Sequence, residues 1–370
     1  MKTIVTDLND FVPEYPMNIL AKEEEILFID IETTGLTPRN TNLYIIGCAY
    51  YENDMWHIIQ WFAEKYEDEL SVLTAFFEFS KRFKFIIHFN GNKFDIPYLE
   101  AKCQEFSLDY NFDHCGGIDI YKRISSYKNI LGLPDMKQKT IEEFLGIDRQ
   151  DTYSGRELIS KYHDYVCDND ETSLNELLLH NEDDIKGMFH IISMIAYYDL
   201  FNNNVRVMKA QANYFNNENK KRSQEIIMKL KLTSPLPVQV SFRGEGCYFS
   251  GYGVDASLKV PLYEEELKYY YSNFKNYYYL PAEDIAMHKS VATFVDKAHR
   301  VQASASNCYT RKKSLFLRQW NIVFEPFYKR DYKDKELFFE LTDEFKKSRQ
   351  DFSSYASHTL NAMLKDNLSY

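Results

Sequence analysis

Cysteine is scarce in this chain, and long apolar runs are missing. The six cysteines among 370 residues form no CxxC pair, which excludes a disulfide framework and the usual zinc sites. The nearest approach to a zinc cluster is His114-Cys115 with Cys103 upstream, and we expect no metal there. No apolar run approaches the roughly 20 residues that span a bilayer, and the opening MKTIVTDLNDFVPEYP lacks the apolar core of a signal peptide. We therefore expect a cytoplasmic protein without membrane contact.

Net positive charge is also missing, which at first argues against nucleic acid as a partner. The formal net charge is -11. The charges are unevenly distributed, however, because the residues from Val205 onward carry an excess of Lys and Arg while those before it carry a large excess of Asp and Glu. This asymmetry favours a carboxylate-rich site in the first part and an anion-holding surface in the second.

Strand and helix patterns alternate in the first part, which indicates an α/β fold rather than a bundle. We expect strands within 26–32, 43–54, 55–62 and 83–89, and helices within 67–83, 95–106 and 173–198. The segment 131–166 is expected to be mostly helical, with a break at Gly146 and a restart near Ser154. Periodicity is lost in DLFNNNVR. We therefore predict an N-terminal arm (1–24), an α/β domain (25–200) and a smaller, basic and aromatic-rich α+β domain (205–370).

Two carboxylates stand inside an apolar strand, ILFIDIETTGL. Asp30 and Glu32 are two apart and project to one face, while Leu27, Ile29 and Ile31 pack on the other. Burial of two adjacent carboxylates is unfavourable, because desolvation and mutual repulsion both disfavour the charged forms. A hard divalent cation bound between the two carboxylates compensates for both the desolvation and the repulsion. The alternative is that the two acids lie where the strand meets water.

Two further places carry acids near apolar segments. Asp95 follows a buried strand and a turn at Asn90, and it begins a helix, where it can equally be an ordinary N-cap. His180 and Asp184 are four apart on a helix and share one face, close beside the core face that Ile185 marks. A charged helix face usually means only contact with water.

Three motifs in order, FIDIETTGL, HFNGNKFDIPYL and HNEDDIKGM, resemble the exonuclease motifs of the DEDD (DnaQ-like) superfamily of 3'-5' exonucleases. The resemblance runs from about residue 25 to 195, and LPDMKQKTIEEFLGIDRQDTYSGRELISKYHDYV extends it to the YprB-like branch. It implies a ribonuclease H-like mixed β-sheet flanked by helices. It also implies that four carboxylates bind metal, namely Asp30, Glu32, Asp95 and Asp184.

The last motif departs from the pattern of the family. His180 lies four residues before Asp184, where one subclass has tyrosine, whereas the other subclass has histidine at a spacing of five. Taking Asp183 as the ligand fits neither spacing, and Ile185 after Asp184 favours Asp184.

The resemblance implies two divalent cations, Mg²⁺ or Mn²⁺, which together activate a water and stabilise the leaving 3'-oxygen. Asp30 would bridge both cations, Glu32 and Asp184 would complete the site of the water, and Asp95 would serve the second cation. His180 would orient or deprotonate the water, because an ordinary pKa of about 6.5 suits a base near neutrality. The alternative is a polar residue that merely flanks the site.

Several residues are candidates for holding the substrate, a single-stranded 3' end. Thr33 and Gly35 would let the backbone approach the terminal nucleotide, as the resemblance implies. Asn90 either holds that nucleotide or braces its own turn. Lys93 is positioned to reach a phosphate, although an exposed lysine usually does nothing specific.

Between His288 and Arg330 the sequence has nine Lys or Arg against two acids. Arg311, Lys312 and Lys313 are candidates for phosphate contacts in this segment, with interleaved Tyr309, Phe316 and Trp320 as candidates for base stacking. The alternative is a basic surface on a packing domain, with the aromatic residues in the core of that domain.

Two other function classes compete with the exonuclease. FIDIETTG superficially resembles the DxDxT signature of haloacid dehalogenase-type phosphatases, but Glu32 replaces its second aspartate. A catalytically weak or silent module that binds nucleic acid is the second alternative. The four carboxylates argue against it, and the altered tyrosine position keeps it as an alternative. The sequence thus favours a metal-dependent 3'-5' exonuclease acting on single-stranded DNA or RNA.

Overall fold

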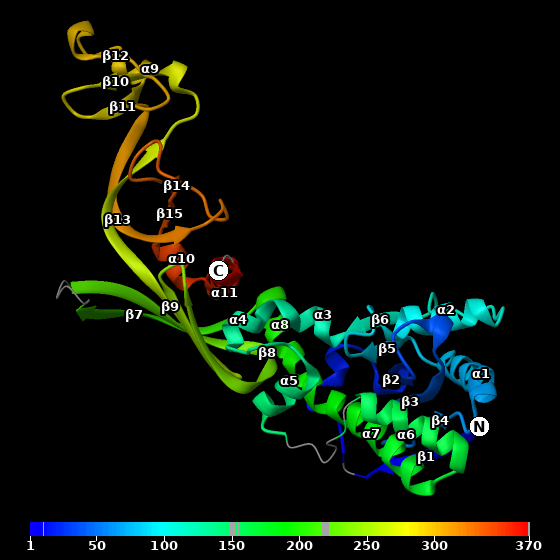
Figure 1. Ribbon diagram of the computed structural model, residues 1–370. Helices are drawn as coiled ribbons and strands as arrows, with labels where there is room; N and C mark the ends of the chain where they lie inside the picture. Colours follow the sequence, from blue (N-terminus) through cyan, green and yellow to red (C-terminus); the bar gives the residue numbers. More distant parts are fainter. Residues whose placement is uncertain (10, 148–152, 154, 217–221, 369–370) are drawn as a thin grey trace. The chain divides into compact units, whose positions relative to one another are not determined.

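The computed structural model describes residues 1–9, 11–147, 153, 155–216 and 222–368. The chain divides into two compact units (Figure 1). The first unit comprises Met1–Asp199 with Ser234–Val238, and the second comprises Leu200–Thr233 with Gln239–Tyr370.

The first unit is built on a mixed six-stranded sheet with the order β1-β4-β3-β2-β5-β6. Its strands are β1 (Lys2–Leu8), β2 (Ile26–Thr33), β3 (Leu43–Glu52), β4 (Met55–Phe62), β5 (Phe85–His88) and β6 (Gly116–Asp119). The central strand β2 is antiparallel to β3 and parallel to β5. Asn53 and Asp54 join β3 to β4 with φ angles of 52° and 61°, the left-handed conformation that a two-residue hairpin turn requires.

The sequence predicts an N-terminal arm over residues 1–24, but the structure places Lys2–Leu8 of this segment in the sheet as strand β1. It pairs antiparallel with β4 along its whole length, from Lys2 opposite Phe62 to Leu8 opposite Trp56. Exposed and partly buried residues alternate along it, and Ile4 packs against the core. Only every second residue contributes to that core, so the strand lacks the apolar density that marks its neighbours.

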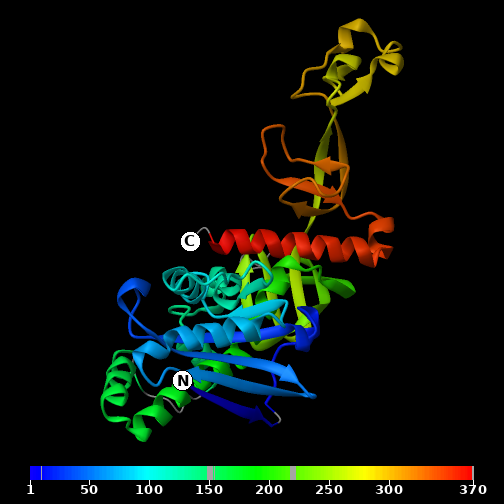
Figure 2. The ribbon, with the colours of Figure 1, turned by 90° about the vertical axis from the view of Figure 1, so that its right-hand side faces the viewer.

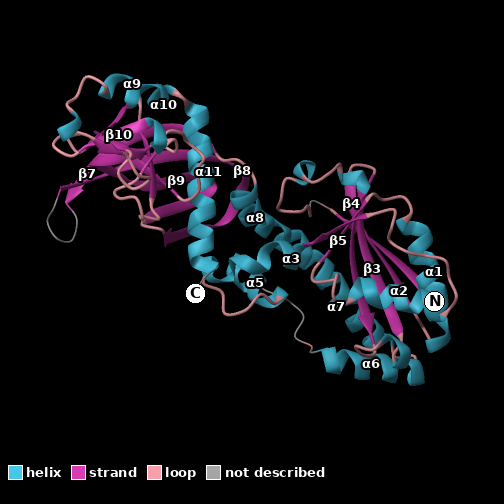
Figure 3. Cartoon of the chain, turned by 90° about the horizontal axis from the view of Figure 1, so that it is seen from above, coloured by secondary structure: helices cyan, strands magenta, loops and turns pink. Residues whose placement is uncertain are grey.

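Helices lie on both faces of this sheet (Figure 3). On one face, Phe76 of α1 (Glu69–Ser80) contacts Trp61, with ring centroids 6.3 Å apart. On the other face, Phe189 of α7 (Glu171–Ile191) contacts Phe28 and Trp56, at 4.8 and 5.0 Å. Trp56 and Trp61 are an odd number apart on β4, so they point to opposite faces. The α/β prediction is therefore confirmed.

The other helices of this unit are α2 (Asp95–Glu105), α3 (Ile120–Ile124), α4 (Lys128–Leu131), α5 (Gln138–Leu145), α6 (Gly155–Asp168) and, continuing into the second unit, α8 (Ile195–Asn202). Helix α5 ends where the sequence predicts, at Gly146, whose φ of 78° favours glycine. Ser154, the expected restart, lies outside the described residues. The long helix expected over 173–198 is interrupted by a 3-10 turn at Ile192–Met194.

The second unit is rich in strands. A six-stranded sheet has the order β14-β15-β13-β9-β8-β7, and a small sheet has the order β11-β10-β12. The strands are β7 (Arg206–Asn216), β8 (Arg222–Gly244), β9 (Cys247–Tyr270), β10 (Tyr277–Leu280), β11 (Ile285–His288), β12 (Val301–Gln302), β13 (Tyr309–Gln319), β14 (Phe327–Tyr328) and β15 (Leu337–Glu340).

Three helices accompany these sheets: α9 (Lys289–Ala292), α10 (Asp343–Lys347) and α11 (Arg349–Leu368), the long C-terminal helix drawn in red in Figure 2. Ser353 and Ser357 of α11 accept hydrogen bonds from the backbone N–H groups of Val207 and Val205, at 2.9 and 3.2 Å. The segment 286–302 holds strand residues at both ends and the four-residue α9 between them. Among the described residues, no helix combines the length and the apolar character that crossing a membrane requires.

Candidate active site

The site is organised by strand β2, which buries one face completely. Leu27 and Ile29 have no exposed surface and Ile31 is 6% exposed, so the alternate residues, Asp30 and Glu32, turn to the opposite face. Helix α7 covers that face. The strand thus holds two carboxylates against a helix that carries acids of its own.

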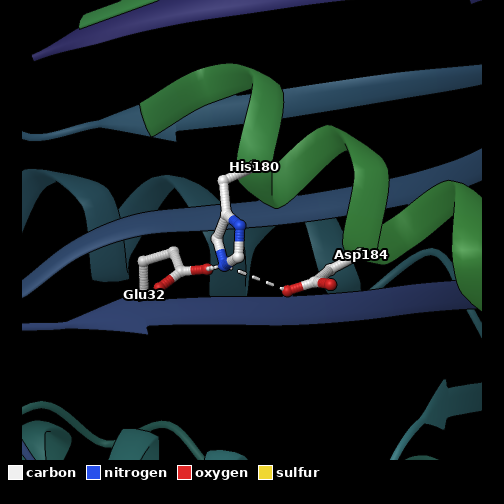
Figure 4. A group of neighbouring side chains, drawn as sticks. All are labelled: Glu32, His180 and Asp184. Atoms are coloured by element: carbon white, nitrogen blue, oxygen red, sulfur yellow. Dashed lines mark ion pairs between the residues drawn. The ribbon is translucent and has the colours of Figure 1, made fainter. Parts of the chain in front are cut away.

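Glu32, His180 and Asp184 form a cluster between β2 and α7 (Figure 4). The His180 Nε2 atom lies 3.5 Å from Glu32 Oε1 and 3.4 Å from Asp184 Oδ2. One nitrogen and two oxygens from the three residues fall within 4.8 Å of one another. The hydroxyl of Tyr44 donates a weak hydrogen bond to Glu32 Oε2 at 3.4 Å. The four-residue spacing on α7 therefore places His180 beside the acid, as the sequence predicts.

Asp30 and Asp95 belong to the same electrostatic cluster. Burial raises the pKa of Asp30 well above its ordinary value, and the charges of Asp184, Glu32 and Asp95 raise it further. Burial likewise raises the pKa of Asp95, at the start of α2, to about 7 against hydrogen bonds from backbone N–H groups. The structure thus brings together all four carboxylates that the sequence singled out.

Glu32 has the third raised pKa in the cluster, about 8. Burial is the largest cause, and His180 opposes it. Carboxyl groups crowded in this way bind either protons or a cation, because each further negative charge is repelled by those present. A donor set of carboxylate oxygens with one imidazole suits hard divalent cations such as Mg²⁺ or Mn²⁺. The residues present therefore fit a divalent metal.

Asn181 belongs to this site and was missed by the sequence reasoning. Its side chain is fully buried, and its Nδ2 atom donates a hydrogen bond to Asp30 Oδ2 at 2.8 Å. A signal existed in the sequence, because Asn181 stands one helical turn before Ile185 on the core face of α7. A polar residue at that position needs a partner, which the sequence alone does not name.

The turn before α2 is braced by Asp119. The backbone N–H groups of Asn90 and Asn92 donate hydrogen bonds to its carboxylate at 3.0 and 3.2 Å, and Asp119 is 4% exposed. This bracing permits the positive φ of Asn90, 62°. The Asn90 Oδ1 atom is buried and accepts no hydrogen bond from any described residue. Lys93 is exposed, with its Nζ atom 5.4 Å from the ring centre of Tyr121.

Thr33 and Gly35 shape the loop that leaves β2. The Thr33 and Thr41 hydroxyls donate to the Gly35 carbonyl oxygen at 2.8 and 3.3 Å. A Cβ atom on Gly35 would lie 2.8 Å from Thr41 Cγ2, so the loop passes too close to itself for a larger residue without adjustment. Contacts within the loop therefore determine the position of the Gly35 backbone.

Arg311, Lys312 and Lys313 lie on β13 of the second unit, where the sheet register supplies acidic partners. Lys313 is opposite Glu266 of β9. Arg311 pairs with Glu266 at 3.3 Å, and Lys312 pairs with Glu340 at 2.6 Å. Part of the basic charge read from the sequence is thus neutralised by cross-strand glutamates.

The base-stacking role considered for Phe316 and Tyr309 is wrong. Phe316 has no exposed surface and lies in a small core cluster, and Tyr309 is 6% exposed with its hydroxyl bonded to Asp284. Trp320 is partly buried against His358, with ring centres 5.6 Å apart. Tyr309 and Phe316 are seven residues apart on β13 and so point to opposite faces of the sheet, where each packs within the second unit.

Comparison with solved structures finds low similarity to two nucleic-acid enzymes. The family B DNA polymerase from the hyperthermophilic archaeon Pyrobaculum calidifontis is 17% identical with a TM-score of 0.38, over 47% of this chain and 25% of the polymerase. E. coli exonuclease I in complex with a dA16 oligonucleotide is 10% identical with a TM-score of 0.28, over 56% of this chain and 54% of that enzyme. At these values the likenesses carry no argument about activity, and the chain spans a quarter to about half of these proteins.

No curated protein matches this chain in sequence. A family model does match: residues 27–196 fit the model described as the RNase_H superfamily. The matched segment contains the whole carboxylate cluster, and its mixed sheet with helices on both faces is the fold that the resemblance implies. Residues 27–196, just under half of the chain, are therefore similar to the ribonuclease H superfamily.

Proposed function

We propose that this protein is a metal-dependent 3'-5' exonuclease that hydrolyses phosphodiester bonds at the ends of single-stranded DNA or RNA. The observation that carries the proposal is the partly buried cluster of Glu32, His180 and Asp184, on which the charges of further carboxylates act. Four carboxylates gathered in this way do not stabilise the fold, since burial of like charges is destabilising. A site for a cation and a phosphate explains why they are together.

Mg²⁺ or Mn²⁺ would be held by Asp30, Glu32, Asp95 and Asp184. When bound, such cations neutralise developing charge on a phosphate and lower the pKa of water. In this proposal the four carboxylates would hold two cations, with Asp30 at the centre of the group because the charges of the other three act on it.

His180 is proposed as the group that takes the proton from the attacking water, at Nε2. Glu32 and Asp184 lie on either side of this nitrogen, at 3.5 and 3.4 Å, and so orient the ring. A proton taken from water would be stabilised there by both carboxylates. The same contacts suit a histidine that only orients the water.

The substrate end would be held by the loop at Thr33 and Gly35 and by the turn at Asn90. Asn90 offers a buried carbonyl oxygen without a described donor, which suits a donor group on a nucleotide. Lys93 in the first unit, and Arg311, Lys312 and Lys313 in the second, are proposed to contact phosphates of the nucleic acid.

Incubation with end-labelled single strands of DNA and RNA, with Mg²⁺, with Mn²⁺ and with EDTA, tests the proposal. We expect loss of nucleotides from the 3' end, dependent on the metal. Release from the 5' end only, or cleavage in EDTA, would contradict it. Binding of the strands without any cleavage would instead support a silent module that binds nucleic acid.

Substitution of His180, the proposed base, should change both kcat and its dependence on pH. We expect His180→Phe to lower kcat by about 100-fold, the lower range for loss of a general base, and to remove the acidic limb of the pH-rate profile. The profile of kcat from pH 5 to 9 measures both effects. His190→Phe, on the same helix but paired with Glu14, should keep the wild-type profile. An unchanged profile in His180→Phe would exclude the base role.

Lys313 tests the role of the second unit. It is exposed, and no ion pair is seen for it among the described residues, so it contributes the most accessible charge of the three on β13. We expect Lys313→Glu to weaken binding of a single strand and to reduce the salt dependence of log K by about 0.7, the contribution of one phosphate contact. Fluorescence anisotropy at several salt concentrations measures this slope. Equal effects of Lys335→Glu, the same charge change at another exposed site, would contradict a specific contact.

A further inference from the structure

We propose that Asn181 is a positioning residue that fixes the Asp30 carboxylate for cation binding, that Gln60 holds Asn181 in place, and that Gly47 leaves room for it. The inference deepens the proposed function and rests on it. Three residues lie opposite one another on the adjacent strands β2, β3 and β4. Asp30 of β2 is opposite Gly47 of β3, and Gly47 is opposite Gln60 of β4. Cross-strand partners point to the same face, so all three residues face helix α7.

Asn181 bridges the two ends of this row. Its Nδ2 atom donates to Asp30 Oδ2 at 2.8 Å, and its Oδ1 atom accepts from Gln60 Nε2 at 2.8 Å. Both Asn181 and Gln60 are at most 1% exposed. The bridge therefore lies within the protein interior, where hydrogen bonds are strong and a lost partner is costly.

Gln60 determines which way the Asn181 amide faces. Its Nε2 atom also donates to the carbonyl oxygen of Leu178, at 2.9 Å. The side-chain nitrogen of Gln60 thus serves two acceptors, one of which is the oxygen of Asn181. With its oxygen held by Gln60, Asn181 presents its N–H group to Asp30. Asp30 receives a donor at a fixed place and its carboxylate is oriented before any cation arrives.

Gly47 makes room for the bridge. A Cβ atom at this position would lie 2.0 Å from Asn181 Oδ1 and 2.6 Å from Ile185 Cδ1. A side chain there would therefore displace the side chains of Asn181 and Ile185. The glycine opposite Asp30 therefore lets α7 approach β2 and β3 closely enough for an asparagine to reach the carboxylate.

The experiment is calorimetric titration of the metal-free full-length protein with Mn²⁺, which does not require turnover. We expect Asn181→Leu, similar in size but without polar atoms, to weaken Mn²⁺ binding by about 10- to 100-fold, as loss of a partner of a metal ligand does. Gln60→Met, which touches no carboxylate, should weaken it in the same direction. The double variant should be no weaker than Asn181→Leu alone, because Gln60 acts through Asn181.

Ser193→Ala is the matched control. Ser193 is 2% exposed, and its hydroxyl donates to the carbonyl oxygen of His190 at 2.6 Å. Its loss removes a buried hydrogen bond near the same helix and should leave Mn²⁺ affinity unchanged. If circular dichroism shows that Asn181→Leu does not fold, the Mn²⁺ affinity of Gln60→Met tests the proposal instead.

The outcomes separate the two proposals. Wild-type affinity for Mn²⁺ in a folded Asn181→Leu or Gln60→Met, in a protein that binds Mn²⁺ and degrades 3' ends, would overturn the positioning role and leave the exonuclease intact. Additive effects in the double variant would overturn the part assigned to Gln60. Failure of the wild-type protein to bind Mn²⁺ would overturn both proposals.

Discussion

Asp30→Asn is expected to lower kcat/KM on a single-stranded 3' end by about 1000-fold or more. Asp30 is the carboxylate on which the charges of Glu32, Asp95 and Asp184 all act, so its loss removes the centre of the proposed cation site. Cations at such a site stabilise transition-state charge by several kcal/mol, and about 4 kcal/mol corresponds to that factor. Steady-state degradation of an end-labelled strand in saturating Mn²⁺ measures it.

A second measurement on the same variant separates loss of chemistry from loss of folding. Removal of one carboxylate relieves repulsion, so the metal-free Asp30→Asn protein should melt several degrees above the metal-free wild type. Glu182→Gln is the matched control, because Glu182 lies on α7 and pairs with Lys186 at 2.5 Å. Its activity should stay within a few-fold of wild type. Full activity in Asp30→Asn would exclude the proposed metal site.

The parts of the site that the sequence predicts are those governed by short-range rules. Alternation on β2 places Asp30 beside Glu32, and the four-residue spacing on α7 places His180 beside Asp184. The positive φ at Gly146 follows from a helix end. Each of these is decided within one turn of a helix or one strand, and each appears in the structure as the pattern indicates.

The remainder depends on which segments meet across the fold. Asn181 reaches Asp30 only because Gly47 lies between Asp30 and Gln60 in the sheet, and no local pattern reveals that row. The partners of Arg311 and Lys312 depend on the register of β13 against its neighbours, which pairs basic residues with glutamates far away in the sequence. Strand β1 similarly gains its place from β4 rather than from its own composition.

The metal-free protein should lose stability as the pH rises from 6 to 9. In the folded state the pKa values are about 8 for Glu32 and about 7 for Asp95, whereas both are about 4 in an unfolded chain. A carboxyl whose pKa is raised by folding binds its proton more tightly in the folded state. Its contribution to stability is therefore complete below about pH 4 and is lost as the pH rises through 7 and then 8.

The expected size follows from the same pKa values. The folded state loses about 1.4 kcal/mol of stability for each pH unit over which the carboxyl is ionised in the unfolded chain but still protonated in the folded one. Glu32 and Asp95 both ionise in the folded state as the pH rises above 6, so the two losses act in the same direction. For a unit of this size each kcal/mol lost lowers the melting temperature by roughly 2–4 °C. Thermal melts in EDTA at pH 6, 7, 8 and 9 measure the fall.

Mn²⁺ should reverse this pH dependence. A cation binds the ionised carboxylates, so it competes with protons and stabilises the folded protein most where the metal-free protein is weakest. With excess Mn²⁺ we expect the melting temperature to fall little between pH 6 and 8, and the gain over EDTA to increase with pH. Glu32→Gln, which removes one titrating carboxyl, should flatten the metal-free curve. A metal-free melting temperature that rises with pH would show that these carboxylates are not held together as the structure places them.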